Sequence, residues 1–287
     1  MQTHAVISCF QSVESWSILS DIERSIKAKI EAAGVPLKDW DIQINYGIKT
    51  GFNDAFIIDS AKRDIILDAC QSKDERQRTA EIIRPILRGR DIRRYSYDWS
   101  NLWIINTHNG IRDSIERVHI EDYPAVKQHL DSYWDRIETR TDQGDTPYNL
   151  RNCAYLDDLT KTKIVWIELS DESKFTLCTD LIPLNTVFFL TGTHLHHILG
   201  LLNSKLIHWY FTRCLGTSSG VGTNRWLKYT VELLPLIPYS DDKLSQWVAE
   251  RLLPNANIEI CEKEIDKLVC ELYSLSPDEK SFIIGNC

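Results

Sequence analysis

The strongest local charge in the sequence lies between residues 84 and 94. This segment holds five arginines against one acid, Asp91, and Tyr95 and Tyr97 follow it. A guanidinium group is planar, always charged and able to form paired hydrogen bonds to phosphate or guanine. The segment therefore predicts either a contact with such a ligand or a charge run that pairs with its own acids, such as Glu81 and Asp98. The arginines are Arg84, Arg88, Arg90, Arg93 and Arg94.

A second, weaker group of basic and aromatic residues follows a glycine-containing loop, residues 216–224. Arg225 and Lys228 are its cations, and Trp226 and Tyr229 its aromatic residues. Basic side chains beside a flexible loop can dock onto a phosphate backbone. The alternative is a strand whose aromatic residues are core, and we expect Trp226 to be buried and Arg225 to point outward.

The chain lacks the common catalytic signatures. We find no phosphate-binding loop, no dinucleotide fingerprint and no nucleophile elbow. His194, His197 and His208 share one face of an expected helix, but a metal site there would need a further ligand, so a partly exposed helix start is the favoured interpretation. Near the end, Ser276, Pro277 and Glu279 predict a capped helix start rather than a nuclease core. We therefore expect no catalytic residues and no metal site.

Composition sets further limits. The 287 residues carry 33 basic and 41 acidic side chains, a formal charge of −8, so any nucleic-acid surface must be local rather than a general excess of positive charge. The eight cysteines are scattered without metal-ligand or dithiol spacing, which favours reduced thiols. No signal peptide or membrane-length apolar run is present, and we expect a cytoplasmic protein without a membrane partner.

The first elements follow from local signals. Ser20 and Glu23 form a capping box that starts an amphipathic helix ending at Gly34. Alternating apolar residues predict a strand over Asp41–Ile48, and Ala55–Ile58 is the expected returning strand. The loop of this expected β-hairpin carries Lys49, Thr50 and Asn53.

Helices and strands then follow without regular alternation. We expect helices over Asp74–Ile83, from Pro124 to Ile137, over Thr193–Phe211, Ser240–Leu252 and Ile258–Leu275, and strands over Leu102–Asn106, Ile164–Leu169, Phe175–Cys178 and Thr186–Leu190. This order favours an α+β fold, with a mixed, largely antiparallel sheet, packed helices and a C-terminal helical appendix. The expected division is a domain of residues 1–239 and a helical segment of residues 240–287.

Two motifs resemble a known family. They are GIKTGFNDAFIID at Gly47–Asp59 and EIIRPILRGRDIRRY at Glu81–Tyr95. They are similar to the TaqI-like C-terminal specificity domain, the target recognition domain of type IIG restriction-modification enzymes and adenine-N6 DNA methyltransferases. Segments from Lys163–Leu169, Pro183–Gly192, Leu199–Phe211 and Glu264–Glu279 agree in order, so the resemblance covers nearly the whole chain.

The resemblance implies a sequence-specific double-stranded DNA recognition module that positions DNA for a catalytic domain outside this chain. The Asn-Pro-Pro-aromatic motif of the methyltransferase domain does not occur in the sequence. S-adenosylmethionine is therefore expected on a partner methyltransferase domain or subunit. Many enzymes of this family also carry a nuclease domain, which is a second expected partner. The implied DNA contacts are Lys49, Thr50, Gly51, Asn53, Arg88, Arg90, Arg93 and Arg94, with Arg225 and Lys228 from the second group. Arg84 and Asp91 are structural candidates, which either pair with each other or cap local backbone.

Two other classes of function stay open from the sequence. One is a stand-alone restriction endonuclease with an unrecognised site. The other is a protein-interaction or assembly subunit whose terminal helices dock a partner. A homodimer that reads a two-part site is a further possibility within the DNA-binding interpretation.

Overall fold

A computed structural model describes residues 19–215 and 223–285. These residues form two compact units. Unit 1 contains residues 19–43, 168–175, 192–215 and 223–285, and unit 2 contains residues 44–167 and 176–191. The expected boundary between residues 239 and 240 stays a prediction, and residues 240–285 belong to unit 1.

Unit 2 contains most of the β-structure, in two four-stranded sheets. The first has the order β10 (Thr176–Cys178), β8 (Lys163–Ile167), β12 (Val187–Gly192), β2 (Ile42–Tyr46), and the pairs β10–β8 and β8–β12 are antiparallel. The second has the order β11 (Ile182–Pro183), β4 (Ile83–Leu87), β7 (Leu102–Ile105), β3 (Ile57–Asp59). In it, β11 lies parallel to β4, while β7 is antiparallel to β4 and to β3. The short pair β5 (Ile92–Arg93) and β6 (Ser96–Tyr97) is antiparallel.

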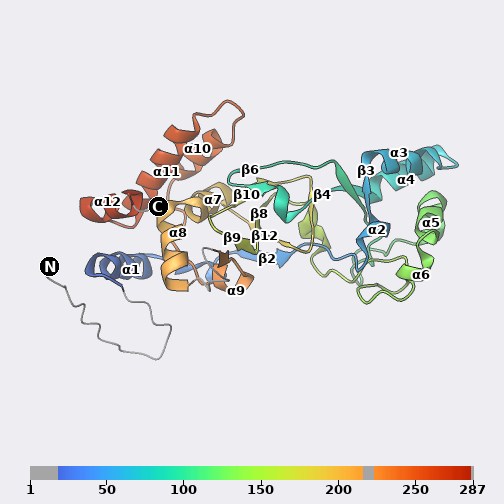
Figure 1. Cartoon of the computed structure of the whole chain (residues 1–287), viewed down its shortest axis with the longest axis horizontal. Helices are drawn as coiled ribbons and strands as arrows, with labels where there is room; N and C mark the ends of the chain where they lie inside the picture. Colours follow the sequence, from blue (N-terminus) through green and yellow to red (C-terminus); the bar gives the residue numbers. More distant parts are fainter. Residues whose placement is uncertain (1–18, 216–222, 286–287) are drawn as a thin grey trace. The chain divides into compact units, whose positions relative to one another are not determined.

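Helices pack beside the second sheet within unit 2. They are α2 (Asn53–Phe56), α3 (Ser60–Asp68), α4 (Lys73–Ile82), α5 (Pro124–Asp131) and α6 (Trp134–Ile137), and Figure 1 shows α3 to α6 grouped together. Helix α4 begins at the cap Ser72, whose hydroxyl accepts from Glu75, and the carboxylate of Glu75 accepts from the amide of Ala125 at the start of α5. Ile86, Ile104, Val126 and Leu130 are fully buried here, which places the core between the sheet and these helices.

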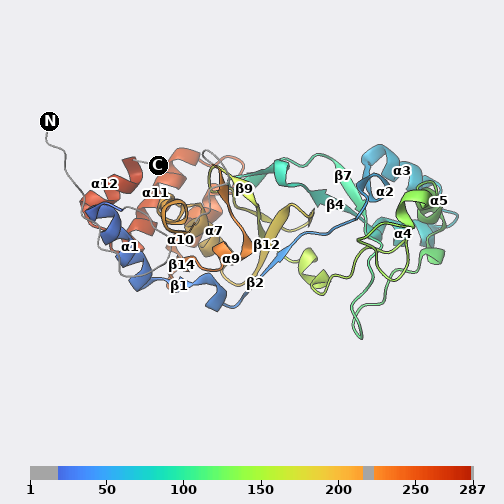
Figure 2. The same ribbon diagram turned by 60° about the horizontal axis from the view of Figure 1, so that its bottom comes forward.

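Unit 1 is mainly helical. It contains α1 (Asp21–Ala33), α7 (Leu195–Asn203), α8 (Lys205–Tyr210), α9 (Lys228–Val231), α10 (Lys243–Arg251), α11 (Ile258–Leu272) and α12 (Pro277–Gly285). Two short antiparallel pairs complete it: β1 (Val35–Pro36) with β14 (Pro235–Leu236), and β9 (Leu169–Ser170) with β13 (Asn224–Arg225). Helix α10 packs on α7 and α11 (Figure 2). Helices α11 and α12 pack on α8.

The α+β fold expected from the sequence is confirmed, and so are the capping boxes at Ser20 and Ser276. Three expectations are wrong. The helix expected from Pro124 to Ile137 is divided into α5 and α6. The two arms of the expected hairpin, β2 and β3, lie in different sheets. The single helix expected over Thr193–Phe211 is divided at Ser204, whose backbone is extended and whose hydroxyl caps α8 by accepting from Ile207. No described helix has the length and apolar character that crossing a bilayer demands.

Candidate nucleic-acid interface

The lysine-bearing turn of unit 2, residues 47–53, is fixed at both of its glycines. Gly47 packs so closely on the backbone of Pro183 that an added Cβ would lie 2.2 Å from that carbonyl oxygen. Gly51 has φ +70°, a left-handed conformation that L side chains rarely adopt. Gly47 therefore serves a close approach within the protein, and Gly51 serves the turn.

The polar side chains of this turn have unequal access. Thr50 is buried and its hydroxyl donates to the Oδ1 atom of Asn53 at 2.6 Å, so these two residues hold each other. Lys49 is partly exposed, and its ammonium lies 5.9 Å from the ring centroid of Tyr46. No carboxylate within residues 19–215 and 223–285 pairs with Lys49, which leaves its charge available to a ligand.

The arginine-bearing turn, residues 88–94, contains one structural ion pair. Arg88 donates to Asp91 through Nε at 2.8 Å and through Nη2 at 2.9 Å, and Ser100 donates to the same carboxylate. Burial alone would raise the pKa of Asp91, but the hydrogen bonds from Arg88 and Ser100 and the charge of Arg88 hold it below its usual range. Of the two alternatives for Arg84 and Asp91, the mutual pair is thus wrong, because Arg88 is the partner of Asp91.

The other arginines of this turn differ in their contacts. Arg93 donates to the carbonyl of Arg90 at 2.7 Å and lies 3.2 Å from the exposed Asp98. Arg94 lies over the ring of Tyr95, with 5.6 Å to its centroid. Arg90 is exposed, and the described part of the chain offers its guanidinium no acidic partner. Arg90 is therefore the arginine of this turn best placed to meet a ligand.

The segment Pro183–Val187 holds the two turns side by side. On one side, Gly47 donates to Val187 at 2.8 Å and Ile48 donates to Pro183 at 2.8 Å. On the other, Leu184 donates to Leu87 at 3.0 Å, and Gly89 packs against Thr186. Two motifs about forty residues apart in the sequence thus flank one segment from later in the chain.

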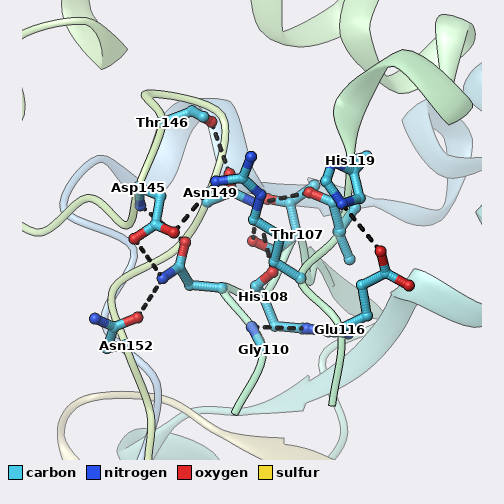
Figure 3. A network of polar contacts seen from close by, with 12 residues as sticks. Thr107, His108, Gly110, Glu116, His119, Asp145, Thr146, Asn149 and Asn152 are labelled. Atoms are coloured by element: carbon cyan, nitrogen blue, oxygen red, sulfur yellow. Dashed lines mark hydrogen bonds and ion pairs between the residues drawn. The ribbon is translucent and has the colours of Figure 1, made fainter. Parts of the chain in front are cut away.

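A polar network in unit 2 fixes the loops beyond the lysine-bearing turn (Figure 3). The buried amide of Asn149 donates to the carbonyl of Val118 at 2.9 Å and accepts from Thr146 at 2.7 Å. Asn109 accepts from the amide of Asp145 at 2.8 Å and donates to Asp145 and Asn152. These bonds tie residues 107–118 to residues 145–152.

Arg140 also fixes residues 147–149 through hydrogen bonds. It was not identified from the sequence. Its guanidinium donates to the carbonyls of Pro147 and Asn149 and lies 4.3 Å from the ring centroid of Phe56. Burial lowers the pKa of Arg140 to about 10, so it stays charged at neutral pH. Nothing in the local sequence marks Arg140, since its partners are backbone carbonyls several residues away.

A pocket of about 230 Å³ opens beside Lys49 within unit 2. Three segments line it: residues 46–49, residues 106–110 and residues 150–156. Asn106, His108 and Tyr155 are among the residues that line it. We call it the Lys49 pocket.

The second basic group lies in unit 1 and is largely paired. Arg225 donates through Nε to Glu168 at 3.1 Å, and Lys228 lies 3.6 Å from Glu232. Trp226 is buried and stacks on Phe211 with ring centroids 3.7 Å apart, while Arg225 is exposed. The expected orientation of this pair is confirmed, whereas a role of Arg225 and Lys228 in DNA binding stays a prediction.

The three histidines also have other partners. His197 bonds the carbonyl of Ile237 at 2.9 Å, His208 bonds Ser173 at 3.2 Å, and His194 stacks on Tyr239. Among the described residues, no group of three or more histidine, cysteine or acidic side chains is arranged to hold a metal ion.

Comparison with known proteins supplies a family and two structural neighbours. Residues 84–236 match the TaqI-like C-terminal specificity domain. The fold is similar to that of the type IIL restriction-modification enzyme MmeI in complex with DNA (TM-score 0.62, 14% identity, 88% of this chain and 35% of that one). It is also similar to the type IIG restriction endonuclease BpuSI (TM-score 0.50, 13% identity, 88% and 33%). This chain thus spans about a third of the length of each neighbour, and no curated protein matches it.

Proposed function

Because the chain belongs to the family of TaqI-like C-terminal specificity domains, we propose that it recognises a defined sequence in double-stranded DNA. In this role it performs no bond-making step. It positions the duplex so that a methyltransferase can extrude and methylate an adenine within the recognised site.

One structural observation carries the proposal. The lysine-bearing and arginine-bearing turns flank the segment Pro183–Val187, and each contributes a cation, Lys49 or Arg90, that no described carboxylate neutralises. Two unpaired cations on neighbouring turns suit contacts to successive phosphates, which fix the register of a protein on DNA. Gly51 shapes the turn, Thr50 and Asn53 brace it, and Arg93 and Arg94 extend the cationic surface.

The acidic remainder of the chain supports selectivity. With a formal charge of −8, most of the surface repels a phosphate backbone, so binding depends on the few exposed cations and is sensitive to salt. Arg225 and Lys228 are weaker contacts, since each has an acidic neighbour that DNA would have to displace.

The proposal includes a partner. A methyltransferase domain or subunit supplies the chemistry, with S-adenosylmethionine as its methyl donor. In some systems a nuclease is added. We place this assembly in the cytoplasm. The similarity of this chain to about a third of two restriction enzymes supports such a partner. Pairing of two copies to read a two-part site is a further form of the proposal.

Selection of duplexes from a randomised pool, with the purified full chain, tests the function. Enrichment of one defined site supports it, and a bound pool without any sequence preference contradicts it. Divalent-metal-dependent cleavage of plasmid by the pure chain would instead favour a stand-alone nuclease. Tight binding to a methyltransferase together with failure to bind any duplex would favour an assembly subunit.

A further inference from the structure

The Lys49 pocket has the size of a site for one small planar ligand. Its volume of about 230 Å³ falls below the roughly 300–1,000 Å³ of sites for drug-sized molecules. Its lining includes the buried apolar residues Ile48, Leu150 and Leu156. A recessed pocket of this kind excludes a paired double helix but admits a single ring system.

Aromatic and cationic groups stand together at one side of the pocket. Tyr46 is 42% exposed, and the ammonium of Lys49 lies over its ring, 5.9 Å from the centroid. Tyr155 holds this residue by donating its hydroxyl to the Tyr46 carbonyl at 3.0 Å, and the two rings meet edge to face at 6.0 Å. An exposed, braced tyrosine ring beside the ammonium of Lys49 is suited to stacking a base whose phosphate lies nearby.

Hydrogen-bonding groups form another part of the wall. The Oδ1 atom of Asn106 is buried and has no hydrogen-bond partner in the described chain, so the polar group that Asn106 offers to the pocket is its amide nitrogen, a donor. The amide of Gly110 donates to the Nδ1 atom of His108 at 3.2 Å, as Figure 3 shows. Since Nδ1 accepts, the neutral ring carries its proton on Nε2 and offers a donor there. The wall therefore combines an amide with an imidazole donor.

The loops that carry these groups are already fixed. Asn109, Asp145 and Asn152 bond one another, and Asn149 ties residues 107 and 108 to the following loop. A ligand therefore meets a largely formed site and loses little affinity to the ordering of loops.

We propose that the Lys49 pocket binds a single unpaired nucleobase, which stacks on Tyr46 and is hydrogen-bonded by Asn106 and His108. Donor and acceptor edges on a flat ring are the chemistry that this wall matches. The base can come from DNA, as a nucleotide displaced from the duplex, or from a free nucleoside. The inference deepens the proposed function when the base comes from DNA, but the pocket does not depend on sequence recognition.

Two measurements on the full chain test the pocket. In the first, the affinity for a paired duplex is compared with that for duplexes carrying one mismatched position each. We expect at least one mismatch to bind about ten-fold more tightly, because the cost of freeing a base is already met. In the second, adenosine, guanosine, cytidine and thymidine are titrated while the amide resonances of residues 106–110 are followed by NMR.

Variants separate this pocket from other surfaces. Tyr46→Leu, Asn106→Leu and His108→Leu should each abolish the mismatch preference or the nucleoside shifts, while His108→Gln, which keeps a donor, should retain them. Tyr229→Leu, at a tyrosine that is 58% exposed in unit 1, is the control and should change neither. Thermal unfolding identifies any variant that fails to fold.

The outcomes are distinct. A mismatch preference that the variants remove supports a base from DNA, and saturable nucleoside binding without that preference supports a free nucleoside. The proposal that the Lys49 pocket binds a base is wrong if the mismatch preference persists in all folded variants. It is also wrong if neither a mismatch preference nor nucleoside binding is found. If the chain binds paired duplexes sequence-specifically but shows neither a mismatch preference nor nucleoside binding, only the proposal for the pocket is wrong. The proposed function is then unaffected.

Discussion

Arg88 and Asp91 form a two-bond ion pair, with Nε to Oδ2 at 2.8 Å and Nη2 to Oδ1 at 2.9 Å. Arg90, two residues after Arg88, is exposed instead. Neighbouring arginines in one cationic run therefore have separable roles. Arg88 holds the turn, and Arg90 is available to DNA.

The first prediction concerns the stability of the arginine-bearing turn. Arg88→Ala should lower the free energy of unfolding by about 1–3 kcal/mol, because the largely buried Asp91 carboxylate loses its charged partner. Arg90→Ala is the matched control and should stay within about 0.5 kcal/mol of wild type. Urea denaturation measures both. Equal stabilities for the two variants would contradict the separation of roles.

The second prediction concerns the contact between Gly47 and Pro183. Gly47→Ala places a Cβ 2.2 Å from the Pro183 carbonyl oxygen, so backbone must move, and we expect a loss of about 3 kcal/mol or more. Gly285→Ala is the control, since nothing lies within 4 Å of a Cβ there. Thermal unfolding compares them, and an unchanged midpoint for Gly47→Ala would contradict this packing.

The third prediction concerns Asn149, which joins two loops of unit 2. Asn149→Ala leaves the Val118 carbonyl without its 2.9 Å donor and removes the acceptor of Thr146. We expect a loss of about 2 kcal/mol and faster amide hydrogen exchange in residues 107–118. Asn255→Ala, at an exposed asparagine, should have neither effect. Unaltered exchange in Asn149→Ala would show that the network does not fix these loops.

The fourth prediction is a pH dependence in unit 1. Burial alone would raise the pKa of Glu279, but hydrogen bonds from Lys29, Ser25 and the amide of Ser276 lower it to about 2. A carboxyl whose pKa is lowered by folding stabilises the protein above its unfolded pKa, about 4.3, and this stabilisation is lost as the pH falls toward 2.

Glu279→Gln therefore removes about 1–3 kcal/mol at pH 7 and flattens the fall in stability between about pH 4.5 and pH 2. Asp278→Asn, at its exposed neighbour, is the control. Urea denaturation across this pH range measures the effect. If the free energy of unfolding falls in parallel with pH for wild type and Glu279→Gln, Glu279 does not contribute the pH dependence.

Local signals in the sequence predicted elements better than their partners. The capping box at Ser20 and Glu23 and the proline at position 124 marked helix starts correctly, because caps depend on residues a few positions apart. Alternation identified β2 but not its neighbour in the sheet, since pairing with β12 depends on residues more than a hundred positions away. The break at Ser204 carried a usable signal, as serine is a favoured helix cap.

In the candidate site, too, local features could be predicted from the sequence better than long-range contacts. Local charge singled out Arg90, and the family resemblance of the motif Gly47–Asp59 implied Lys49. Polarity alone suggested that Trp226 points inward and Arg225 outward. A pair between Asp91 and Arg84, one of two alternatives, was wrong: Arg84 and Arg88 both lie within reach of Asp91 in the sequence, and the sequence does not distinguish them. Arg140 and Asn149 were missed because they bond backbone carbonyls, which every residue carries.

The fifth prediction is the most direct test of DNA recognition through the two turns. The duplex carries the selected site. Lys49→Ala and Arg90→Ala should each make the negative slope of log affinity against log salt less steep by about one unit, because each removes one phosphate contact. Lys73→Ala and Arg76→Ala, at exposed cations of α4, should leave the slope at its wild-type value. A wild-type slope in both Lys49→Ala and Arg90→Ala would contradict the account.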